Sequence, residues 1–275
     1  MEVWHRMKRS PMAVIGLVLI IVLFVMALFA NVIAPFTYSK QNLVHAFESP
    51  SSKYIFGTDE FGRDIFSRIV YGARISLQVG FIAVGISMFI GGFLGALAGY
   101  YGGKIDNVIM RIMDVLLSIP SILLAIAIAA SLGPGLFNLM IAVGISAIPN
   151  YARIVRGSVL SIRGQEFVEA AKAVGSSDLR IIFKHIIPNC TAPIIVQATL
   201  GVATAILTAA GLSFIGLGIQ PPIPEWGAML SSGRSYIRDY PYMTLFPGLA
   251  IMITILALNF VGDGLRDALD PKLKR

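Results

Sequence analysis

Six apolar runs in this chain are long enough to cross the hydrocarbon core of a lipid bilayer. A helix that rises about 1.5 Å per residue needs about 20 apolar residues to cross a core about 30 Å thick. In lipid the backbone must satisfy its own hydrogen bonds, so runs of this length fold as helices. The sequence therefore predicts an all-α, polytopic membrane protein with six transmembrane helices, at about 12–35, 75–100, 109–132 (interrupted by Pro120), 136–151, 192–217 and 242–261.

The composition of the chain agrees with this class. Hydrophobic residues make up 56% of the sequence and charged residues 13%, and the mean hydropathy is +0.78. A soluble domain rarely combines such values. The formal net charge is +7, and in a membrane protein basic cytoplasmic loops explain it more simply than a nucleic-acid partner, so none is expected. The single cysteine, Cys190, excludes an internal disulfide bond.

The basic residues are distributed unequally between the two sides of the predicted membrane. Six spans put both termini on one side, and cytoplasmic termini leave 15 Lys and Arg residues inside and 7 outside. The positive-inside rule favours this orientation. We therefore expect a cytoplasmic collar (1–11), a first span (12–35), an extracytoplasmic segment (36–74), a five-helix core (75–261) and a cytoplasmic tail (262–275). The apolar block after residues 1–10 is too long for the core of a cleavable signal peptide.

The predicted extracytoplasmic segment contains the polar stretch FGTDEFGRDIFSR at residues 56–68. Thr58 or Asp59 can cap a helix, and Asp64 and Arg68 are spaced to pair on one helix face. The apolar residues fall on the other side, which predicts a short amphipathic helix on the membrane surface. Later in the chain, the prolines of residues 220–226 predict an extended loop, and a short surface helix is expected within 228–240.

A second polar stretch, at residues 165–188, lies between the fourth and fifth predicted spans. Residues 165–174 have helical periodicity, and Gly175 is placed to end this helix because glycine adopts the left-handed conformation easily. Ser176 or Ser177 can cap a second helix that ends at Pro188. The stretch therefore predicts a helix, a glycine corner and a second helix. The apolar side of the first helix is expected to consist of Phe167, Val168, Ala170, Ala171 and Val174.

Two small residues give this hairpin a possible docking face. Ala170 and Ala171 present almost no side chain, so a partner surface could approach the helix backbone closely. Glu169 offers an anchoring charge beside them. The pattern alone leaves two interpretations open. The hairpin either binds a partner protein or is a basic interfacial hairpin attracted to anionic lipid.

The hairpin resembles the EAA loop of ABC-importer permease subunits. In that family Glu-Ala-Ala is followed by three residues, a glycine, nine residues and then Ile-x-Leu-Pro. The same spacing here joins Glu169-Ala170-Ala171, Gly175 and His185-Ile186-Ile187-Pro188. His185 and Ile187 depart from the family residues, and only His185 introduces a polar side chain.

Three further motifs resemble the dipeptide, oligopeptide and nickel branch of that family. They follow the family's order, and the resemblance covers about residues 10–275, closest to the C-type subunits of dipeptide permeases. The motifs are Gly57-Thr58-Asp59 with Gly62-Arg63-Asp64 and Ser67-Arg68; Pro222-Ile223-Pro224-Glu225-Trp226-Gly227; and residues 262–267 with Asp270-Pro271.

The resemblance implies a transport subunit in a bacterial or archaeal cytoplasmic membrane, with no catalytic, cofactor-binding or metal-binding residues. Such a subunit pairs with a second homologous permease. Two cytoplasmic ATP-binding subunits, which bind ATP and Mg, grip the hairpins, and an extracytoplasmic binding protein delivers the substrate. The implied coupling residues are Glu169, Ala170, Ala171, Gly175, Ile187 and Pro188, and the extracytoplasmic motif comprises Gly57, Thr58, Asp59, Gly62, Arg63 and Asp64.

Other functions fit the residues less well. The chain has no glycine-rich phosphate loop ending in Gly-Lys-Ser or Gly-Lys-Thr, so ATP hydrolysis is expected elsewhere. The interior of the spans lacks the charges that an ion-coupled carrier uses. An intramembrane hydrolase would need a nucleophile and a base, but the three histidines lie outside the spans. Gln197 and Asn259 either line the path or bond between helices. The motifs do not separate dipeptides or oligopeptides from nickel or another small cargo.

Overall fold

The computed structural model describes residues 2–269, and within this range the chain is helical with no strand. A single antiparallel bridge joins Thr58 and Asp64. The all-α prediction is confirmed. The helices are α1 Glu2–Met7, α2 Pro11–Leu28, α3 Ala30–Ile33, α4 Ile65–Tyr101, α5 Gly103–Leu117, α6 Ser121–Leu132, α7 Leu136–Ile162, α8 Glu166–Ala173, α9 Asp178–Arg180, α10 Thr191–Phe214, α11 Trp226–Gly233 and α12 Tyr242–Leu269.

Five helical stretches are long and apolar enough to cross a membrane: α2, α4, α7, the run from Asp178 to Phe214 that includes α10, and α12. A sixth crossing exists only if α5 and α6, which are bent by 86°, count as one broken span. The predicted third span, 109–132, is therefore not one straight helix. The break falls at residues 118–120, where Pro120 lacks the amide hydrogen needed to continue the ladder.

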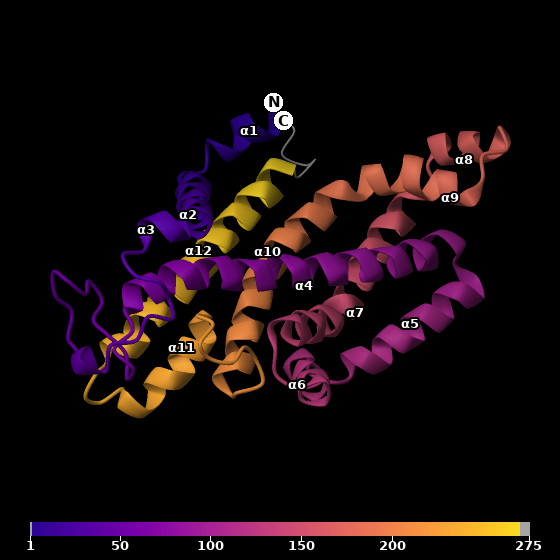
Figure 1. Cartoon of the computed structure of the whole chain (residues 1–275). Coiled ribbons are helices and arrows are strands. Elements are labelled where there is room, and N and C mark those ends of the chain that lie inside the picture. Colours follow the sequence, from indigo (N-terminus) through magenta and orange to yellow (C-terminus); the bar gives the residue numbers. More distant parts are fainter. Residues whose placement is uncertain (1, 270–275) are drawn as a thin grey trace.

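Helix α4 is the longest element and connects the two ends of the molecule (Figure 1). Its 37 residues span about 55 Å, well beyond a hydrocarbon core of about 30 Å. The prediction of a separate amphipathic surface helix before residue 75 is wrong. Residues 57–64 form a loop, and the helix that begins at Ile65 is already α4. The cap is Asp64, whose carboxylate accepts from the Ser67 amide, instead of Thr58 or Asp59.

Glycines on one face of α4 allow α7 to pack against its backbone. A Cβ atom at Gly95 would lie 2.2 Å from the carbonyl oxygen of Ala152, and one at Gly91 would lie 2.5 Å from that of Ile148. Gly99 continues the same face one turn later, against Val159. Such close approach is how membrane helices gain packing energy, since lipid supplies no hydrophobic drive for their association.

The other spans pack on this pair at different places: α10 contacts both helices, α2 and α12 contact α4, and α6 contacts α7. The main apolar core lies among α4, α7, α10 and α12 and includes Leu77, Leu139, Ile206 and Leu258. Helices α7 and α12 run past their predicted ends, to Ile162 and Leu269, so the expected tail is helical as far as it is described. Residues 270–275 of that tail, and Met1 of the collar, lie outside the described range.

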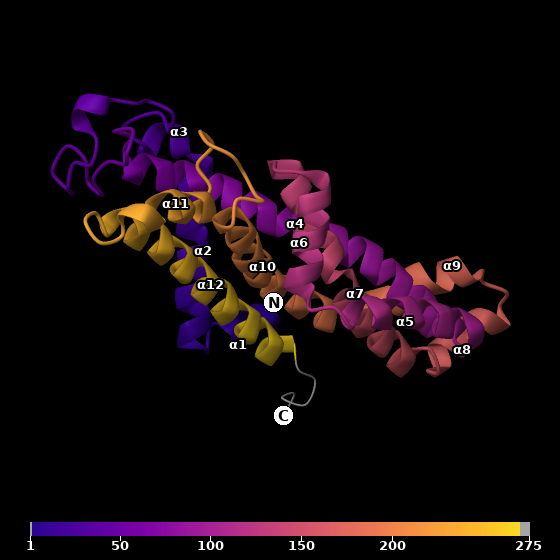
Figure 2. The ribbon, with the colours of Figure 1, turned by 90° about the horizontal axis from the view of Figure 1, so that it is seen from below.

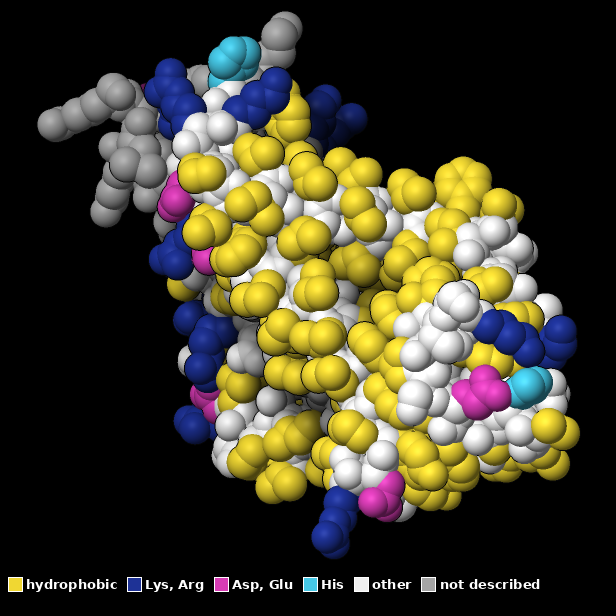
Figure 3. Space-filling model, turned by 90° about the vertical axis from the view of Figure 1, so that its left-hand side faces the viewer, with side chains coloured by type: hydrophobic (Ala, Val, Ile, Leu, Met, Phe, Trp, Pro, Cys, Tyr) yellow, Lys and Arg dark blue, Asp and Glu magenta, His cyan; other side chains and the backbone are white. Residues whose placement is uncertain are grey.

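Different segments lie at the two ends of the molecule. In Figures 1 and 2 residues 34–64 lie at one end of α4, near α11, and the α8–α9 hairpin lies at the other. Helix α1 packs beside the end of α12, where Met7 and Ala268 share a small apolar cluster. Figure 3 shows a broad apolar face with charged side chains gathered at its ends and edges. Exposed residues of α2, such as Ile15, Val18 and Val22, suit contact with lipid.

Candidate functional site: the coupling hairpin and the polar cluster at the opposite end of α4

The predicted hairpin between the fourth and fifth spans has the expected glycine corner. Helix α8 ends at Ala173, and Gly175 adopts φ +77°. The Gly175 amide donates to the Lys172 carbonyl and the Ser176 amide to the Ala171 carbonyl, which satisfies two of the helix's last carbonyls. A Cβ at Gly175 would meet nothing within 4 Å, so the backbone conformation, and not space, is what favours glycine there.

The second arm of the hairpin does not end at Pro188, contrary to the prediction. After α9, residues Ile181–Ile186 form a π-helical stretch and Ile187–Cys190 a 3₁₀ turn, and the chain continues directly into α10. Pro188 removes one backbone donor, and the change of helical type around it keeps the chain helical. Ser177 stands at the N-cap of α9 without a side-chain capping bond.

The two alanines of the hairpin face different ways. Ala171 is buried beside Val168, and both pack on Ile181, Ile182 and Ile186 of the second arm. Ala170 is exposed, together with Glu169, Gly175 and Val174, the last of which is 80% exposed. The predicted apolar side was therefore too wide, because consecutive helical residues point about 100° apart. The exposed face suits a partner, and Ala171 holds the hairpin together.

Polar contacts fix the hairpin to the C-terminal end of α4. The Tyr100 hydroxyl donates to the Asp178 carboxylate at 2.7 Å, and the Lys172 ammonium lies 5.3 Å from the centre of the Tyr100 ring. The Arg163 guanidinium donates to the Gly99 carbonyl at 2.9 Å. The first two contacts join the hairpin to α4, and the third joins the end of α7 to α4.

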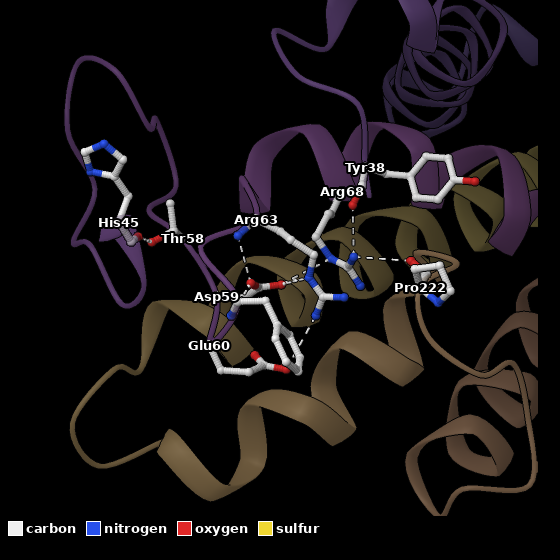
Figure 4. Close-up of polar contacts among 9 residues, drawn as sticks. Tyr38, His45, Thr58, Asp59, Glu60, Arg63, Arg68 and Pro222 are labelled. Carbon is white, nitrogen blue, oxygen red and sulfur yellow. Dashed lines mark hydrogen bonds and ion pairs between the residues drawn. The ribbon is translucent and has the colours of Figure 1, made fainter. Parts of the chain in front are cut away.

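The opposite end of α4 holds a buried polar cluster, drawn in Figure 4. The Arg63 side chain donates to Asp59 at 2.6 Å, and the Asp59 carboxylate also accepts the Arg63 amide at 2.9 Å. Arg68 approaches the same carboxylate at 3.6 Å, and Glu60 lies 3.4 Å from Arg63. Asp59, Arg63 and Arg68 are almost fully buried. Because an unpaired buried charge is costly, the carboxylate and the two guanidinium groups stabilise one another. The expected Asp64–Arg68 pair does not form.

This cluster brings together two sequence motifs that are far apart in the chain. Arg68 donates to the carbonyl of Tyr38 at 3.1 Å and to that of Pro222 at 3.3 Å. The indole of Trp226, fully buried, donates to the Ile69 carbonyl at 3.1 Å. The sequence predicted both motifs but not their contact. The extended loop predicted at 220–226 is confirmed as far as residue 225, and α11 begins at Trp226. The available signal was Trp226, because a large aromatic side chain next to the prolines is expected to be buried against another element.

Glycine and threonine residues shape the loop that carries the cluster. Gly57 and Gly62 have φ of +79° and +67°, and a Cβ at Gly62 would lie 1.9 Å from the Asn42 carbonyl oxygen. The Thr58 hydroxyl donates to the His45 carbonyl and accepts the Glu48 amide. The six residues of the predicted extracytoplasmic motif therefore form one folded unit at the start of α4.

Burial perturbs three carboxyl groups around this unit. It raises the pKa of Asp64, one of whose oxygens has no partner within residues 2–269, and the nearby Ser67 bonds only partly offset this. Burial also raises the pKa of Glu60, with Asp59 adding to the effect. Burial raises the pKa of Glu225, although its two oxygens accept the Gly227 and Ala228 amides and so cap α11.

The two predicted path-lining amides occupy different surroundings. Gln197 lines a cavity of about 90 Å³ among α4, α7 and α10, and a larger one of about 520 Å³ that reaches Arg266 on α12. Asn259 does not line either of these cavities and is half-buried on α12. Of the two amides, only Gln197 lines these cavities.

Two family models match this sequence. The model described as the binding-protein-dependent transport system inner membrane component matches residues 91–275. The model described as the N-terminal transmembrane domain of oligopeptide transport permease C matches residues 1–50. Together they leave only residues 51–90 outside, which contain the buried polar cluster and the first part of α4.

Curated relatives match almost the whole chain. It is 54% identical to the dipeptide transport system permease protein DppC of Alkalihalophilus pseudofirmus, over 99% of this chain and 90% of that one. It is 47% identical to the glutathione transport system permease protein GsiD of Pectobacterium atrosepticum (99% and 91%) and 46% identical to the di/tripeptide transport system permease protein DppC of Pseudomonas aeruginosa (99% and 92%).

A solved structure has a similar fold. A chain of the inward-facing MetNI methionine ABC transporter superposes with a TM-score of 0.60 over 74% of this chain and 97% of that chain, at 21% identity. At this identity the likeness concerns the fold alone.

Proposed function

The chain belongs to the family of binding-protein-dependent transport system inner membrane components, and on that premise we propose that it is the permease subunit of an ATP-driven importer of dipeptides or oligopeptides. It makes and breaks no bond itself. Its task is to convert movement of the α8–α9 hairpin into a rearrangement of its membrane helices. ATP and Mg are bound and used by separate subunits.

The observation that carries this proposal is the combination of an exposed face and a fixed base on the hairpin. Glu169, Ala170 and Gly175 are open to a partner, whereas Val168 and Ala171 are packed inside. Ile187 and Pro188 lie in the turn that leads into α10. A cytoplasmic ATP-binding subunit that grips the exposed face would therefore move α10 through the covalent chain and α4 through Tyr100 and Asp178.

The complete transporter in this proposal contains a second homologous permease, two ATP-binding subunits and an extracytoplasmic binding protein. The hairpin and the packed α1–α12 end would face the cytoplasm, in agreement with the distribution of Lys and Arg residues. Residues 34–64 and α11, at the opposite end of α4, would face outward, where the delivering protein docks. The chain would thus be a multi-pass protein of a bacterial or archaeal cytoplasmic membrane with both termini inside.

The names of the relatives support a peptide cargo, since they are permeases for dipeptides, di- and tripeptides and glutathione. A nickel importer of the same branch is the second candidate on motif grounds. A nickel importer is disfavoured because the residues that line the cavity of about 90 Å³ among α4, α7 and α10 offer no carboxylate, imidazole or thiolate to a metal ion. An ion-coupled carrier would need intramembrane charges that these lining residues also lack.

Charge reversal on the hairpin tests the coupling role. Glu169→Lys should lower peptide uptake by proteoliposomes and loosen co-purification of the ATP-binding subunit, because it inverts the anchoring charge on the docking face. Asp267→Lys makes the same charge change at another exposed carboxylate, on α12, and should leave both unchanged. Normal uptake and normal co-purification in Glu169→Lys would exclude this face as the docking surface.

A further inference from the structure

A small polar cavity lies where α4, α7 and α10 meet, and the first residue of α6 also lines it. Its volume is about 90 Å³, which accommodates a few water molecules and is smaller than a typical ligand pocket of about 300–1,000 Å³. The polar side chains around it carry no charge: Ser87, Ser121, Ser146, Asn150, Tyr151, Gln197, Thr204 and Thr208. Ser87 lies near the middle of α4 and Asn150 near the middle of α7, so the cavity lies near the middle of these two helices.

Most hydroxyl groups of this cavity already use their hydrogen on their own helix. Ser87 donates to the Ala83 carbonyl at 2.7 Å, and Ser146 to the Val143 carbonyl at 2.8 Å. Thr208 does the same toward Thr204 on α10. Such back-bonded hydroxyls keep their lone pairs, so toward the cavity they act as acceptors.

Two side-chain amides in the cavity have no such partner. Within residues 2–269 the amides of Asn150 and Gln197 make no hydrogen bond, and the Tyr151 hydroxyl bonds only the main-chain carbonyl of Gln197. One amide comes from α7 and the other from α10, and both line the same cavity. Each offers two N–H donors and one carbonyl acceptor. Asn150 is exposed and Gln197 half-buried, so both amides are open to water or to a ligand in the cavity.

The chemistry of these groups matches a peptide bond. A peptide unit presents one N–H donor and one C=O acceptor, which a side-chain amide can pair with reciprocally, while the hydroxyl oxygens can accept further N–H groups. The absence of charged lining residues means that neither a bare cation nor the ionised ends of a peptide find a counter-charge at this point.

Gln197 also connects this cavity to a larger space. It lines the cavity of about 520 Å³ on the hairpin side, together with Cys190 at the start of α10 and Arg266 on α12. A peptide unit that leaves the small cavity past Gln197 would therefore enter a wider volume. The small cavity is the narrow part of this route, and it must widen before a whole dipeptide can pass.

We propose that Asn150 and Gln197 form a recognition site for peptide groups at the narrow part of the translocation path, pairing with the N–H and C=O of each peptide bond as it passes. This assignment rests on the proposed function and extends it from cargo class to residues. Selection at this point acts on the peptide backbone, so side chains of the cargo are free to vary.

The test compares two cargoes that differ by one N–H. Alanyl-glycine and alanyl-sarcosine differ only in that the second carries a methyl group on its peptide nitrogen. Uptake of each is measured in proteoliposomes with the complete transporter and the same binding protein. The variants are Asn150→Leu and Gln197→Met, which keep the side-chain shape and remove the amide. Asn259→Leu is the matched control, since its amide lies away from both cavities.

Wild type and Asn259→Leu should give the same ratio of alanyl-glycine uptake to alanyl-sarcosine uptake. Asn150→Leu and Gln197→Met should lower alanyl-glycine uptake about tenfold and shift this ratio toward 1. Binding-protein-stimulated ATP hydrolysis should persist in all variants, which shows that they fold and assemble. Unchanged uptake and an unchanged ratio in both cavity variants would overturn the recognition site while leaving the peptide importer intact. Failure of the wild type to carry either dipeptide would instead overturn the proposed function.

Discussion

The backbone contact between α4 and α7 makes a quantitative prediction about Gly95. A Cβ at this position would lie 2.2 Å from the Ala152 carbonyl oxygen, whereas ordinary contacts begin at 3.4 Å. Gly95→Ala therefore requires the two backbones to separate by about 1.2 Å, the difference between those distances. The Cβ is bonded directly to the α4 backbone and the oxygen belongs to the α7 backbone, so no side-chain rotation can relieve the clash.

The expected loss of stability follows from two opposing effects. Overpacking of this kind costs about 1–3 kcal/mol, and a rigid backbone contact belongs at the upper end. Replacing glycine with alanine inside a helix gains about 1 kcal/mol. The net loss of unfolding free energy is then about 2 kcal/mol, which for a chain of this size lowers the melting temperature by about 4–8 °C.

Thermal unfolding of the purified transporter in detergent measures this shift. Two glycines of the same helix serve as controls, because a Cβ at Gly92 would lie 3.9 Å from Val155 and one at Gly85 would meet nothing within 4 Å. Gly92→Ala and Gly85→Ala should therefore match or slightly exceed the wild type. Equal melting temperatures for Gly95→Ala and both controls would show that α4 and α7 do not pack backbone to backbone.

Two further predictions concern the opposite ends of α4. Burial raises the Asp64 pKa, so the folded state binds this proton more tightly than the unfolded state, and the melting temperature should rise as the pH falls from above the folded pKa toward the ordinary Asp value. Asp64→Asn keeps a capping oxygen for Ser67 and should weaken this pH dependence; an unchanged pH profile would contradict the assignment. Orientation can be tested in intact cells with a membrane-impermeant maleimide: a cysteine replacing Val44, 89% exposed, should react, and one replacing Val174, 80% exposed, should not. The reverse pattern would invert the proposed topology.

Much of this architecture could be predicted because it depends on local sequence. Hydropathy over about 20 residues decides which segments enter a bilayer, and the all-α fold follows from backbone hydrogen bonding in lipid. The corner at Gly175 is equally local, since it depends on one residue's tolerance of positive φ. The spacing of the hairpin motif, and with it the family, could be read from the chain alone.

The errors in the prediction share a physical origin in long-range contacts. Whether residues 57–64 form a helix or a loop depends on buried bonds such as that between Asp59 and Arg63, and helical propensity does not encode them. The inward position of Ala171 depends on the second arm that covers it. The near-right-angle bend between α5 and α6 was visible only as a proline, which marks a break without giving its angle.

The sequence by itself determined that this chain crosses a membrane as helices and carries an exposed hairpin between two of them, because each property depends on residues close together in the chain. Only the tertiary structure decided that two distant motifs meet around Arg68 and that α4 links them to the hairpin. The same holds for the amides of Asn150 and Gln197, which share one cavity. These relations depend on how helices far apart in sequence pack, and such packing is settled only when the whole chain has folded.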